Sequence, residues 1–299
     1  MKDAYFAVVN PAAGGGRGRK MIAPALERLR AGGVQVDIAE TQAPGQGTEL
    51  ARDAYRRGYR RFLAVGGDGT SYEVVNGLFP LAQNGERPAL AFLPLGTGNS
   101  FLREFSDRGV EHSMEALLSG RSVPCDVLRL THLEGAIHYI NLLSVGFTAD
   151  VATMRARRFS GWGELGYQSS IFICLARFRR RPFPLSVDGG EVDRRPCLFL
   201  TFNNSKFTGG TMMIAPQADV SDGLIEYVRW GPIGRVGLIR NLPTLYDGTH
   251  IEHPLAERRA AKRIDFHLDA PVDVMVDGEV LTLHCRTLDV LPSALHVMV

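Results

Sequence analysis

The sequence has few cysteines, no long apolar run and almost no net charge. The four cysteines are scattered without C-x-x-C spacing, which argues against a zinc site or a disulfide framework and favours a reducing cytoplasm. No apolar run approaches the ~20 residues that span a bilayer, and the chain enters a predicted strand without a leader-like segment. We therefore expect a protein that is neither secreted nor integral to a membrane. With 34 Lys and Arg against 32 Asp and Glu, the charge balance does not predict a nucleic-acid partner.

The sequence motifs of the common nucleotide-binding folds are absent as well. The chain has no Walker sequence G-x-x-x-x-G-K-[ST] and no dinucleotide fingerprint G-x-G-x-x-G. It also has neither the H-R-D nor the D-F-G signature of protein kinases. Any nucleotide site must therefore be built in another way.

The most informative stretch is residues 62–70, where an apolar run ends in Gly-Gly-Asp-Gly-Thr. Helical periodicity resumes after it, so the pattern predicts a strand, a tight turn and a helix N-terminus. Glycines let a bulky anion approach, and the N–H groups of a helix N-terminus favour phosphate. Asp68 would repel phosphate unless Mg²⁺ bridges the two or unless it accepts a proton from an attacking hydroxyl. On its own, such a turn is more often a plain loop.

Three further turns, like this one, directly follow a predicted strand. Apolar strands are predicted at residues 5–9, 34–38 and 89–92, with helices between them, for example at residues 48–57. This alternation predicts a parallel sheet, and the carboxyl ends of its strands would meet at one edge. Asn10, Thr41 and residues 94–99 then converge with the Gly-Gly-Asp-Gly-Thr turn, which favours a nucleotide site, although turns of this kind are always rich in Gly, Asn and Thr.

The second half changes to short alternating segments, which predict an antiparallel sandwich. We expect an α/β domain over residues 1–124 and a β-rich domain over residues 125–287. The expected strands lie at residues 123–130, 138–145, 197–202, 224–230, 264–268, 272–276 and 281–284.

Two acidic segments in this half are candidates for chemistry. Asp219 and Asp222 stand next to a turn glycine and could offer oxygen ligands to Mg²⁺, although spacing alone favours an ordinary acidic turn. Asp277 and Glu279 flank Gly278, and Asp-Gly is also the commonest hairpin turn.

Three motifs together resemble the diacylglycerol kinase catalytic-domain family, which includes bacterial lipid kinases, sphingosine kinases and ceramide kinases. They are Asn10-Pro11 with the glycines after it, Gly-Gly-Asp-Gly-Thr with Glu73 and Asn76, and residues 94–99, Pro-Leu-Gly-Thr-Gly-Asn. The second half carries matching cues, namely Gly146-Phe147 with Asp150, Gly209-Gly210, Pro216 and Asp222-Gly223-Leu224. The resemblance implies an NAD kinase/diacylglycerol kinase-like α/β domain and a lipid-substrate sandwich, with a last strand at about 288–299 that returns to the first domain.

The resemblance also implies roles for individual residues. ATP and its phosphates would contact Asn10, Pro11, Thr41, Gly66, Gly67, Asp68, Gly69, Thr70, Glu73, Gly96, Thr97 and Asn99. A structural Mg²⁺ would be held by the Asp222 side chain and by oxygens at Asp219 and Leu224. Glu279 would be the base, with Asp277 and Asp68 in a Mg²⁺ and water network, although these roles could be exchanged. One departure is Ser100, where family members commonly carry Asp.

The sequence therefore predicts an ATP-dependent lipid kinase with diacylglycerol as the default acceptor. A ceramide or sphingoid-base kinase, an NAD kinase and a catalytically silent lipid- or nucleotide-binding regulator are the alternatives. We expect a cytoplasmic protein in peripheral contact with the inner face of a membrane, without a nucleic-acid partner; a homodimer is compatible with the sequence.

Membrane contact is suggested by a segment that combines cations with aromatic and aliphatic side chains. Its members are Arg155, Arg157, Arg158, Trp162, Tyr167, Ile171, Phe172, Arg177, Phe178, Arg179, Arg180 and Arg181. Such a segment is typical of an interfacial helix. A helix packed on the sandwich with solvated arginines explains it equally well.

Overall fold

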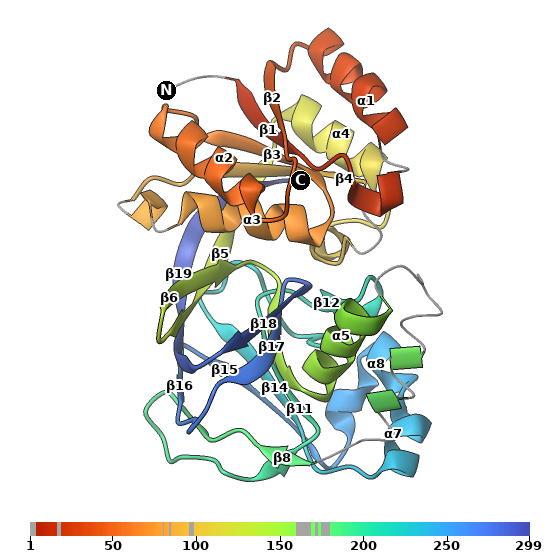
Figure 1. The fold of residues 1–299 in the computed structure, drawn as a ribbon, viewed down its shortest axis with the longest axis vertical. Helices are drawn as coiled ribbons and strands as arrows, with labels where there is room; N and C mark the ends of the chain where they lie inside the picture. Colours follow the sequence, from red (N-terminus) through yellow and green to blue (C-terminus); the bar gives the residue numbers. More distant parts are fainter. Residues whose placement is uncertain are drawn as a thin grey trace.

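The protein folds into two lobes that share one long strand (Figure 1). The computed structural model describes residues 4–16, 19–79, 81–83, 85–95, 99–159, 169–170, 173–174 and 180–299. The first lobe is α/β and the second is mainly β. The fold therefore agrees with the predicted α/β domain followed by an antiparallel sandwich.

A parallel sheet forms the centre of the first lobe. Its strands lie in the order β2 (Val36–Glu40), β1 (Tyr5–Val9), β3 (Arg61–Gly66) and β4 (Ala89–Pro94). Successive residues of β1, β3 and β4 belong alternately to two different hydrophobic cores, because neighbouring side chains of a strand point to opposite faces. Both faces of the sheet are thus buried, which explains why these strands are continuous apolar runs.

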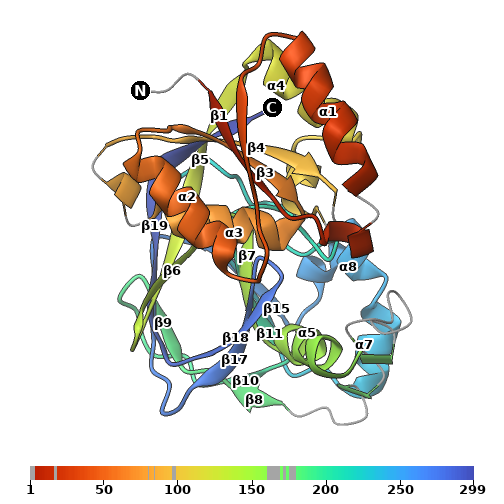
Figure 2. The same cartoon turned by 45° about the horizontal axis from the view of Figure 1, so that its top comes forward.

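Helices cover the two faces in pairs (Figure 2). Helices α1 (Arg19–Ala31) and α4 (Val110–Ser119) share one core with the sheet, and α2 (Gln46–Arg56) and α3 (Asp68–Leu78) share the other. Short 3-10 helices follow the strands or precede the next element at η1 (Ala13–Gly16), η2 (Leu81–Gln83) and η3 (Phe101–Glu104). The start of α3 therefore lies at the carboxyl edge of the sheet, directly after β3.

Two sheets pack face to face in the second lobe. The first contains β5 (Ser122–His132), β6 (Gly135–Tyr139), β9 (Leu185–Val187), β16 (Arg263–Phe266) and β19 (Cys285–Met298). The second has the order β15 (Ala256–Ala261), β14 (Ile225–Trp230), β11 (Phe199–Asn203), β7 (Leu142–Gly146), β17 (Val272–Val276) and β18 (Glu279–Leu283). A core of buried apolar side chains from both sheets lies between them. The pairing is antiparallel throughout the second sheet.

The outer face of the second sheet is covered by helices. They are α5 (Phe147–Arg158), α7 (Arg235–Asn241) and α8 (Thr244–Asp247), followed by the 3-10 helix η4 (Thr249–Glu252). Two short antiparallel strand pairs complete the lobe. One joins β8 (Arg181–Pro182) to β10 (Pro196–Cys197), and the other is the hairpin of β12 (Phe207–Thr208) and β13 (Met212–Met213).

Strand β19 connects the two lobes. It is antiparallel to β5 over most of its length, and at His296 and Val297 it pairs in parallel with β4. The first-lobe sheet and one sheet of the sandwich are therefore a single continuous sheet. Strand β5 begins at Ser122 and runs through the predicted boundary between residues 124 and 125.

The prediction of one strand over residues 138–145 is wrong. Strand β6 ends at Tyr139, and β7 begins at Leu142 in the other sheet. The N–H groups of Ile140, Asn141 and Leu142 donate to the carboxylate of Asp277 at 3.0, 3.1 and 2.9 Å. At this point the buried Asp277 side chain accepts the backbone hydrogen bonds that a neighbouring strand would otherwise accept. An alternating apolar pattern in the sequence cannot reveal such a contact.

His138 links α3 to β6 and is buried at 1% exposure. Its ring stacks on Phe79 at 5.3 Å between centroids. Its backbone N–H and C=O pair with the side-chain amide of Asn76 at 2.9 and 2.8 Å. Within the described part of the chain, neither ring nitrogen has a hydrogen-bond partner. Burial, with Arg129 nearby, lowers the pKa of His138 to about 4.

Replacement of His138 by Phe should make the protein more resistant to acid. The pKa of His138 is lower in the folded than in the unfolded state. The contribution of the neutral ring to the free energy of unfolding is therefore present above the unfolded pKa and is lost as the pH falls toward 4. The wild type should lose about 3 kcal/mol more free energy of unfolding than His138→Phe between about pH 7 and pH 4. Urea denaturation at both pH values measures this, and equal losses in the two proteins would contradict it.

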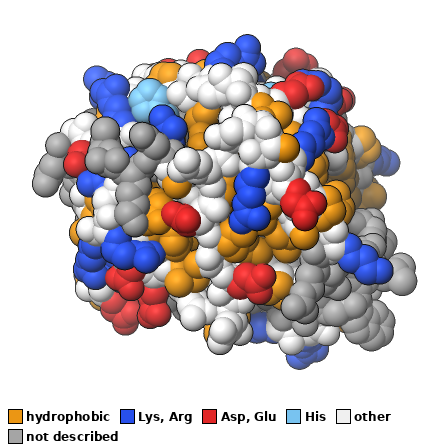
Figure 3. Space-filling model, turned by 90° about the horizontal axis from the view of Figure 1, so that it is seen from above, with side chains coloured by type: hydrophobic (Ala, Val, Ile, Leu, Met, Phe, Trp, Pro, Cys, Tyr) orange, Lys and Arg blue, Asp and Glu red, His pale blue; other side chains and the backbone are white. Residues whose placement is uncertain are grey.

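The surface of the first lobe carries charges of both signs. Seen from above, Lys and Arg are interspersed with Asp and Glu around exposed apolar side chains (Figure 3). None of the helices that the structure describes is both long and apolar enough to cross a membrane.

Candidate active site

The turn after β3 is shaped by close packing. Gly67 is extended and precedes α3, and its carbonyl accepts from the N–H groups of Thr70 and Ser71 at 3.0 and 3.2 Å. A Cβ on Gly66 would lie 2.2 Å from the Thr70 hydroxyl oxygen, so the position requires glycine. The Thr70 hydroxyl is buried and has no hydrogen-bond partner among the described residues. The predicted strand, turn and helix start are thus present, with a donor group still available.

The residues that follow the carboxyl ends of β1 and β2 lie at the same edge of the parallel sheet. Asn10 follows β1, its N–H donates to Val65 O at 2.9 Å, and its side-chain oxygen accepts from Ala12 N at 3.0 Å. Thr41 follows β2 and donates to Val9 O through both its N–H and its hydroxyl, at 2.8 and 3.3 Å.

The first turn and the turn after β4 also touch each other. Pro11 is half-buried in the first turn. Gly14 has a positive φ of 61°, and a Cβ there would lie 2.6 Å from Leu95 O. Gly96 and Thr97 lie outside the described residues.

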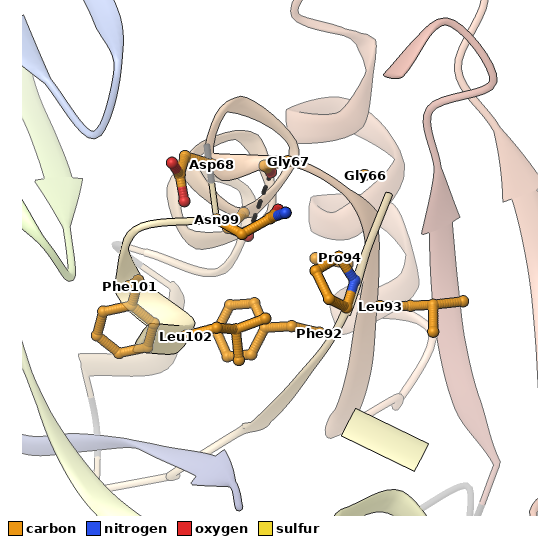
Figure 4. Close-up of a pocket in the computed structure, with 11 residues that line it drawn as sticks. Gly66, Gly67, Asp68, Phe92, Leu93, Pro94, Asn99, Phe101 and Leu102 are labelled. Atoms are coloured by element: carbon orange, nitrogen blue, oxygen red, sulfur yellow. Dashed lines mark hydrogen bonds between the residues drawn. The ribbon is translucent and has the colours of Figure 1, made fainter. Parts of the chain in front are cut away.

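Asp68 begins α3 and is held by the segment after β4. Its carboxylate accepts from Ser100 N at 3.2 Å and also from the Ser100 hydroxyl and Phe101 N. Burial nevertheless raises the pKa of Asp68, and these hydrogen bonds only partly oppose the rise. Asn99, with a positive φ of 46°, stands beside it (Figure 4).

A small pocket lies next to Asp68. It has a volume of about 10 Å³, close to the lower limit for one water molecule. It is lined by Ala64, Gly66, Gly67, Asp68, Ser71, Phe92, Leu93, Pro94, Asn99, Phe101 and Leu102.

Ser100 connects the two lobes at this point. It is 3% exposed, and its hydroxyl oxygen accepts from Gly210 N, in the β12–β13 hairpin, at 2.8 Å. Because the same hydroxyl donates to Asp68, the departure from the family pattern avoids a second buried carboxylate beside Asp68.

The β17–β18 hairpin brings Glu279 to the start of α3. Asp277 and Gly278 have φ of 47° and 91°, the left-handed values that a two-residue hairpin of the I′ type needs. A Cβ on Gly69 would lie only 2.6 Å from Glu279 Oε1, so the absence of a side chain there lets the carboxylate approach the first turn of α3. Burial and the Glu73 carboxylate raise the pKa of Glu279. An acidic group from one lobe thus faces the glycine-rich turn of the other.

Asp277 is turned toward the protein interior. It is 4% exposed, and its carboxylate accepts the three N–H groups at positions 140–142 described above. Burial raises its pKa to about 7, a rise that the three hydrogen bonds oppose and that nearby Asp68 supports. This arrangement makes Asp277 the anchor of the hairpin that carries Glu279.

Glu73 is already engaged by the protein. Its two carboxylate oxygens accept from Gly45 N and Gly47 N at 2.7 Å each, where α2 begins. Anions are favoured at helix N-termini, so this contact ties α3 to α2. Burial raises the pKa of Tyr72, and the nearby carboxylates of Asp277, Glu279 and Glu73 add to the rise.

The acidic loop after β13, which contains Asp219 and Asp222, lies beside β5, where Gly223 N donates to Asp126. Asp219 Oδ1 accepts from Ser221 N and its hydroxyl at 2.9 Å, and Asp222 Oδ1 accepts from Leu224 N at 2.9 Å. Burial and the Asp219 carboxylate are among the causes that raise the pKa of Asp222. Among the residues that the structure describes, no three His, Cys, Asp or Glu side chains form a group that could hold a metal. Hard oxygen donors whose charges repel one another nonetheless fit Mg²⁺.

Asp126 lies beside this acidic loop and was missed by sequence reasoning. It is fully buried, and its carboxylate accepts from Gly223 N and Ser293 N at 2.6 Å each. Burial raises its pKa, and the carboxylates of Asp222 and Asp219 add to the rise. Its signal in the sequence is a single carboxylate inside the apolar strand predicted at residues 123–130.

The cationic and aromatic segment, for which the sequence left membrane contact and packing on the sandwich equally open, is only partly described. Arg155, Arg157 and Arg158 end α5, whose apolar side packs on the second sheet. Arg181 pairs with Asp150 on α5 at 2.6 Å. Trp162, Tyr167, Ile171, Phe172, Arg177, Phe178 and Arg179 lie outside the described residues.

Two family models match the chain. Residues 4–130 match the diacylglycerol kinase catalytic domain, and residues 141–299 match the YegS C-terminal NAD kinase beta sandwich-like domain. The chain belongs to the diacylglycerol kinase catalytic-domain family. It is therefore a lipid kinase, and a kinase of this family implies the use of ATP.

Two of the similar proteins extend over nearly the whole chain, and a third extends over about two thirds of it. A diacylglycerol kinase of Mycobacterium tuberculosis is 28% identical over 98% of this chain and 94% of its own length. One from Bacillus subtilis is 26% identical over 93% and 90%. A probable YegS-like lipid kinase of Chromohalobacter salexigens is 33% identical over 68% and 64%.

Solved structures have the same fold. The crystal structure of a putative diacylglycerol kinase from Bacillus anthracis superposes with a TM-score of 0.79 at 21% identity, covering 99% of this chain and 95% of that one.

Proposed function

We propose that this lipid kinase transfers the γ-phosphoryl group of ATP to the hydroxyl of diacylglycerol, while it is in peripheral contact with the inner face of a membrane. The observation that carries the proposal is the approach of Glu279 to Gly69, which sets a carboxylate opposite a turn suited to phosphates. The relatives named diacylglycerol kinase support this acceptor.

Each residue has a distinct part in the transfer. Glu279 accepts the proton of the lipid hydroxyl while the hydroxyl oxygen forms a bond to the γ-phosphorus. The bond between the γ-phosphorus and the leaving ADP oxygen breaks. The glycine turn with the free Thr70 hydroxyl cradles the phosphates. Asp277 acts as a positioning residue, because it holds the hairpin.

Mg²⁺ fits two places in this scheme. Asp68, a buried carboxylate next to the phosphate turn, would hold a Mg²⁺ that neutralises the charge of the phosphates. Asp222, with oxygens at Asp219 and Leu224, would hold a second ion that stabilises the loop against β5, where Asp126 adds negative charge.

A phosphoryl-transfer assay tests the function. Labelled ATP and Mg²⁺ are offered with diacylglycerol, ceramide, sphingosine or NAD in detergent micelles, with Asp68→Ala as the inactive control. We expect diacylglycerol to be labelled by the wild type and not by the variant. Labelling of ceramide or sphingosine alone would replace the acceptor, labelling of NAD alone would make this an NAD kinase, and ATP binding without any transfer would indicate a regulator.

Gly69→Ala should separate catalysis from stability. The new Cβ would lie 2.6 Å from Glu279 Oε1, the mobile end of a flexible side chain, so the carboxylate should move away at little cost. Alanine also favours a helix by up to ~1 kcal/mol over glycine. We expect an unchanged or higher melting temperature with a fall of about 10-fold or more in kcat, because a small misplacement of a base is costly. A fully active variant would contradict the placement of Glu279.

A further inference from the structure

Helix α7 is anchored to the second lobe by one side only. Leu238 is 1% exposed and belongs to the core that contains Trp230 and Leu245. A Cβ on Gly237 would lie 2.8 Å from Ile233 Cγ1, so this side of the helix sits close to the protein. The opposite side therefore faces outward.

Large apolar side chains stand on this outward side. Val236 is 63% exposed and Ile239 is 51% exposed, and the two lie three residues apart on one face of α7. Tyr246, on the adjoining helix α8, is 52% exposed. An exposed cluster of this kind is characteristic of a surface that meets another molecule.

Arginines accompany these apolar side chains. Arg235 and Arg240 are exposed, and each lies four residues from an apolar member, Ile239 or Val236. A Cβ on Gly234 would lie 3.6 Å from Arg180 Nη2, which places a third guanidinium at the start of α7. Arg180, Gly234, Arg235, Val236 and Gly237 line a shallow hollow of about 520 Å³. The sequence contains no Asp or Glu between residues 230 and 246, and the exposed Asp247 that ends α8 is the first carboxylate after this stretch.

We propose that this α7 surface, made of Arg180, Arg235, Val236, Ile239, Arg240 and Tyr246, docks on an anionic lipid bilayer. Aliphatic side chains enter the boundary between headgroups and acyl chains, arginines pair with lipid phosphates, and tyrosine prefers that interface. A second copy of the chain fits less well, because a two-fold contact through α7 would bring arginines against arginines.

The position of the surface agrees with the proposed function, on which this inference rests. Helices α5, α7 and α8 lie on the same side of the second lobe in both views (Figures 1 and 2). Helix α5 packs against β17, the strand that leads into the hairpin of Glu279. Docking through α7 would therefore bring the side of the lobe next to the candidate active site toward the lipid.

Vesicle co-sedimentation of the full chain tests the proposal. The probes are phosphatidylcholine vesicles with and without phosphatidylglycerol. We expect the wild type to bind much better when phosphatidylglycerol is present. The double variant Arg235→Glu with Arg240→Glu should bind these vesicles more weakly, by about 5-fold or more for each substituted arginine. Val236→Ser with Ile239→Ser should weaken binding to both vesicles by ~10-fold.

Two matched controls lie elsewhere. Leu133→Ser removes an equally exposed apolar side chain, 60% exposed, from the β5–β6 turn on the other side of the lobe. Arg30→Glu reverses one charge on α1 in the first lobe, as each of the two α7 substitutions does. Both controls should bind vesicles like the wild type.

Three outcomes would overturn the inference. They are vesicle binding by the α7 variants at the wild-type level, an absence of vesicle binding by the wild type, and dissociation of a homodimer by the substitutions, measured by sedimentation velocity. Transfer to diacylglycerol in neutral detergent micelles should be unchanged in all variants, since micelles remove the need for a bilayer. Failure of that transfer in the wild type would count against the proposed function, and failure of vesicle binding alone counts against the α7 surface.

Discussion

Glu279→Gln should lower kcat for lipid phosphorylation by about 10²- to 10⁴-fold, the usual contribution of a general base. Glutamine keeps the size of the side chain and can still occupy the space that Gly69 leaves open, where Oε1 lies 2.6 Å from the position of an added Cβ. It cannot take the proton of the lipid hydroxyl. We therefore expect an unchanged KM for ATP and an unchanged melting temperature. Initial rates with diacylglycerol in mixed micelles provide the measurement.

The pH profile gives a second test of the same assignment. Burial and Glu73 raise the pKa of Glu279, so the wild type should lose kcat on the acid side as the carboxylate becomes protonated. This acid limb should be absent from the residual activity of Glu279→Gln. Glu279→Asp keeps the charge but shortens the side chain by one methylene, so it should be intermediate in rate and should retain the limb. If Glu279→Gln keeps nearly full activity, the base is a different residue.

Local patterns predicted the glycine-rich turn at residues 66–70 well. The apolar strand, the glycines and the helix start at residues 62–70 follow from steric requirements that act within a few residues, and the structure shows the same requirement at Gly66. The parallel sheet and the antiparallel sandwich followed from the spacing of apolar residues for the same reason.

Contacts between distant segments could not be read from such patterns. The approach of Glu279 to Gly69 joins the two lobes, and only the family resemblance indicated it. Asp126 appeared as a single carboxylate in a mainly apolar strand, although it accepts from the N–H groups of Gly223 and Ser293. In each case the deciding partner is far away in sequence, so no periodicity records it.

Glu73 shows the converse problem. Its place in the phosphate motif suggested a role toward ATP, yet in the structure both carboxylate oxygens bind N–H groups at the start of α2. A motif can thus combine residues that face the ligand with residues that hold the motif in place. Asn76 is a second case, since its amide binds the backbone of His138.

Asp277→Ala should destabilise the protein by about 3–5 kcal/mol, because it removes the acceptor of three buried N–H groups. The same change frees the hairpin that presents Glu279, so kcat should fall as well, although Asp277 itself does not touch the reacting groups in our scheme. Urea denaturation and the micelle assay measure the two effects. A stable variant with an intact hairpin would show that water replaces the carboxylate.

Asp277→Asn should show how the charge of this residue affects stability. Burial raises the folded pKa to about 7, above the unfolded value, so the contribution to stability is present below the unfolded pKa and is lost as the pH rises through 7. The wild type should therefore lose about 3 kcal/mol from this group between about pH 5 and pH 8. Because asparagine cannot ionise, the free energy of unfolding of the variant should fall by about 3 kcal/mol less than that of the wild type over the same pH range. If both proteins changed equally with pH, the carboxylate would have to be ionised throughout, with the three N–H groups outweighing its burial.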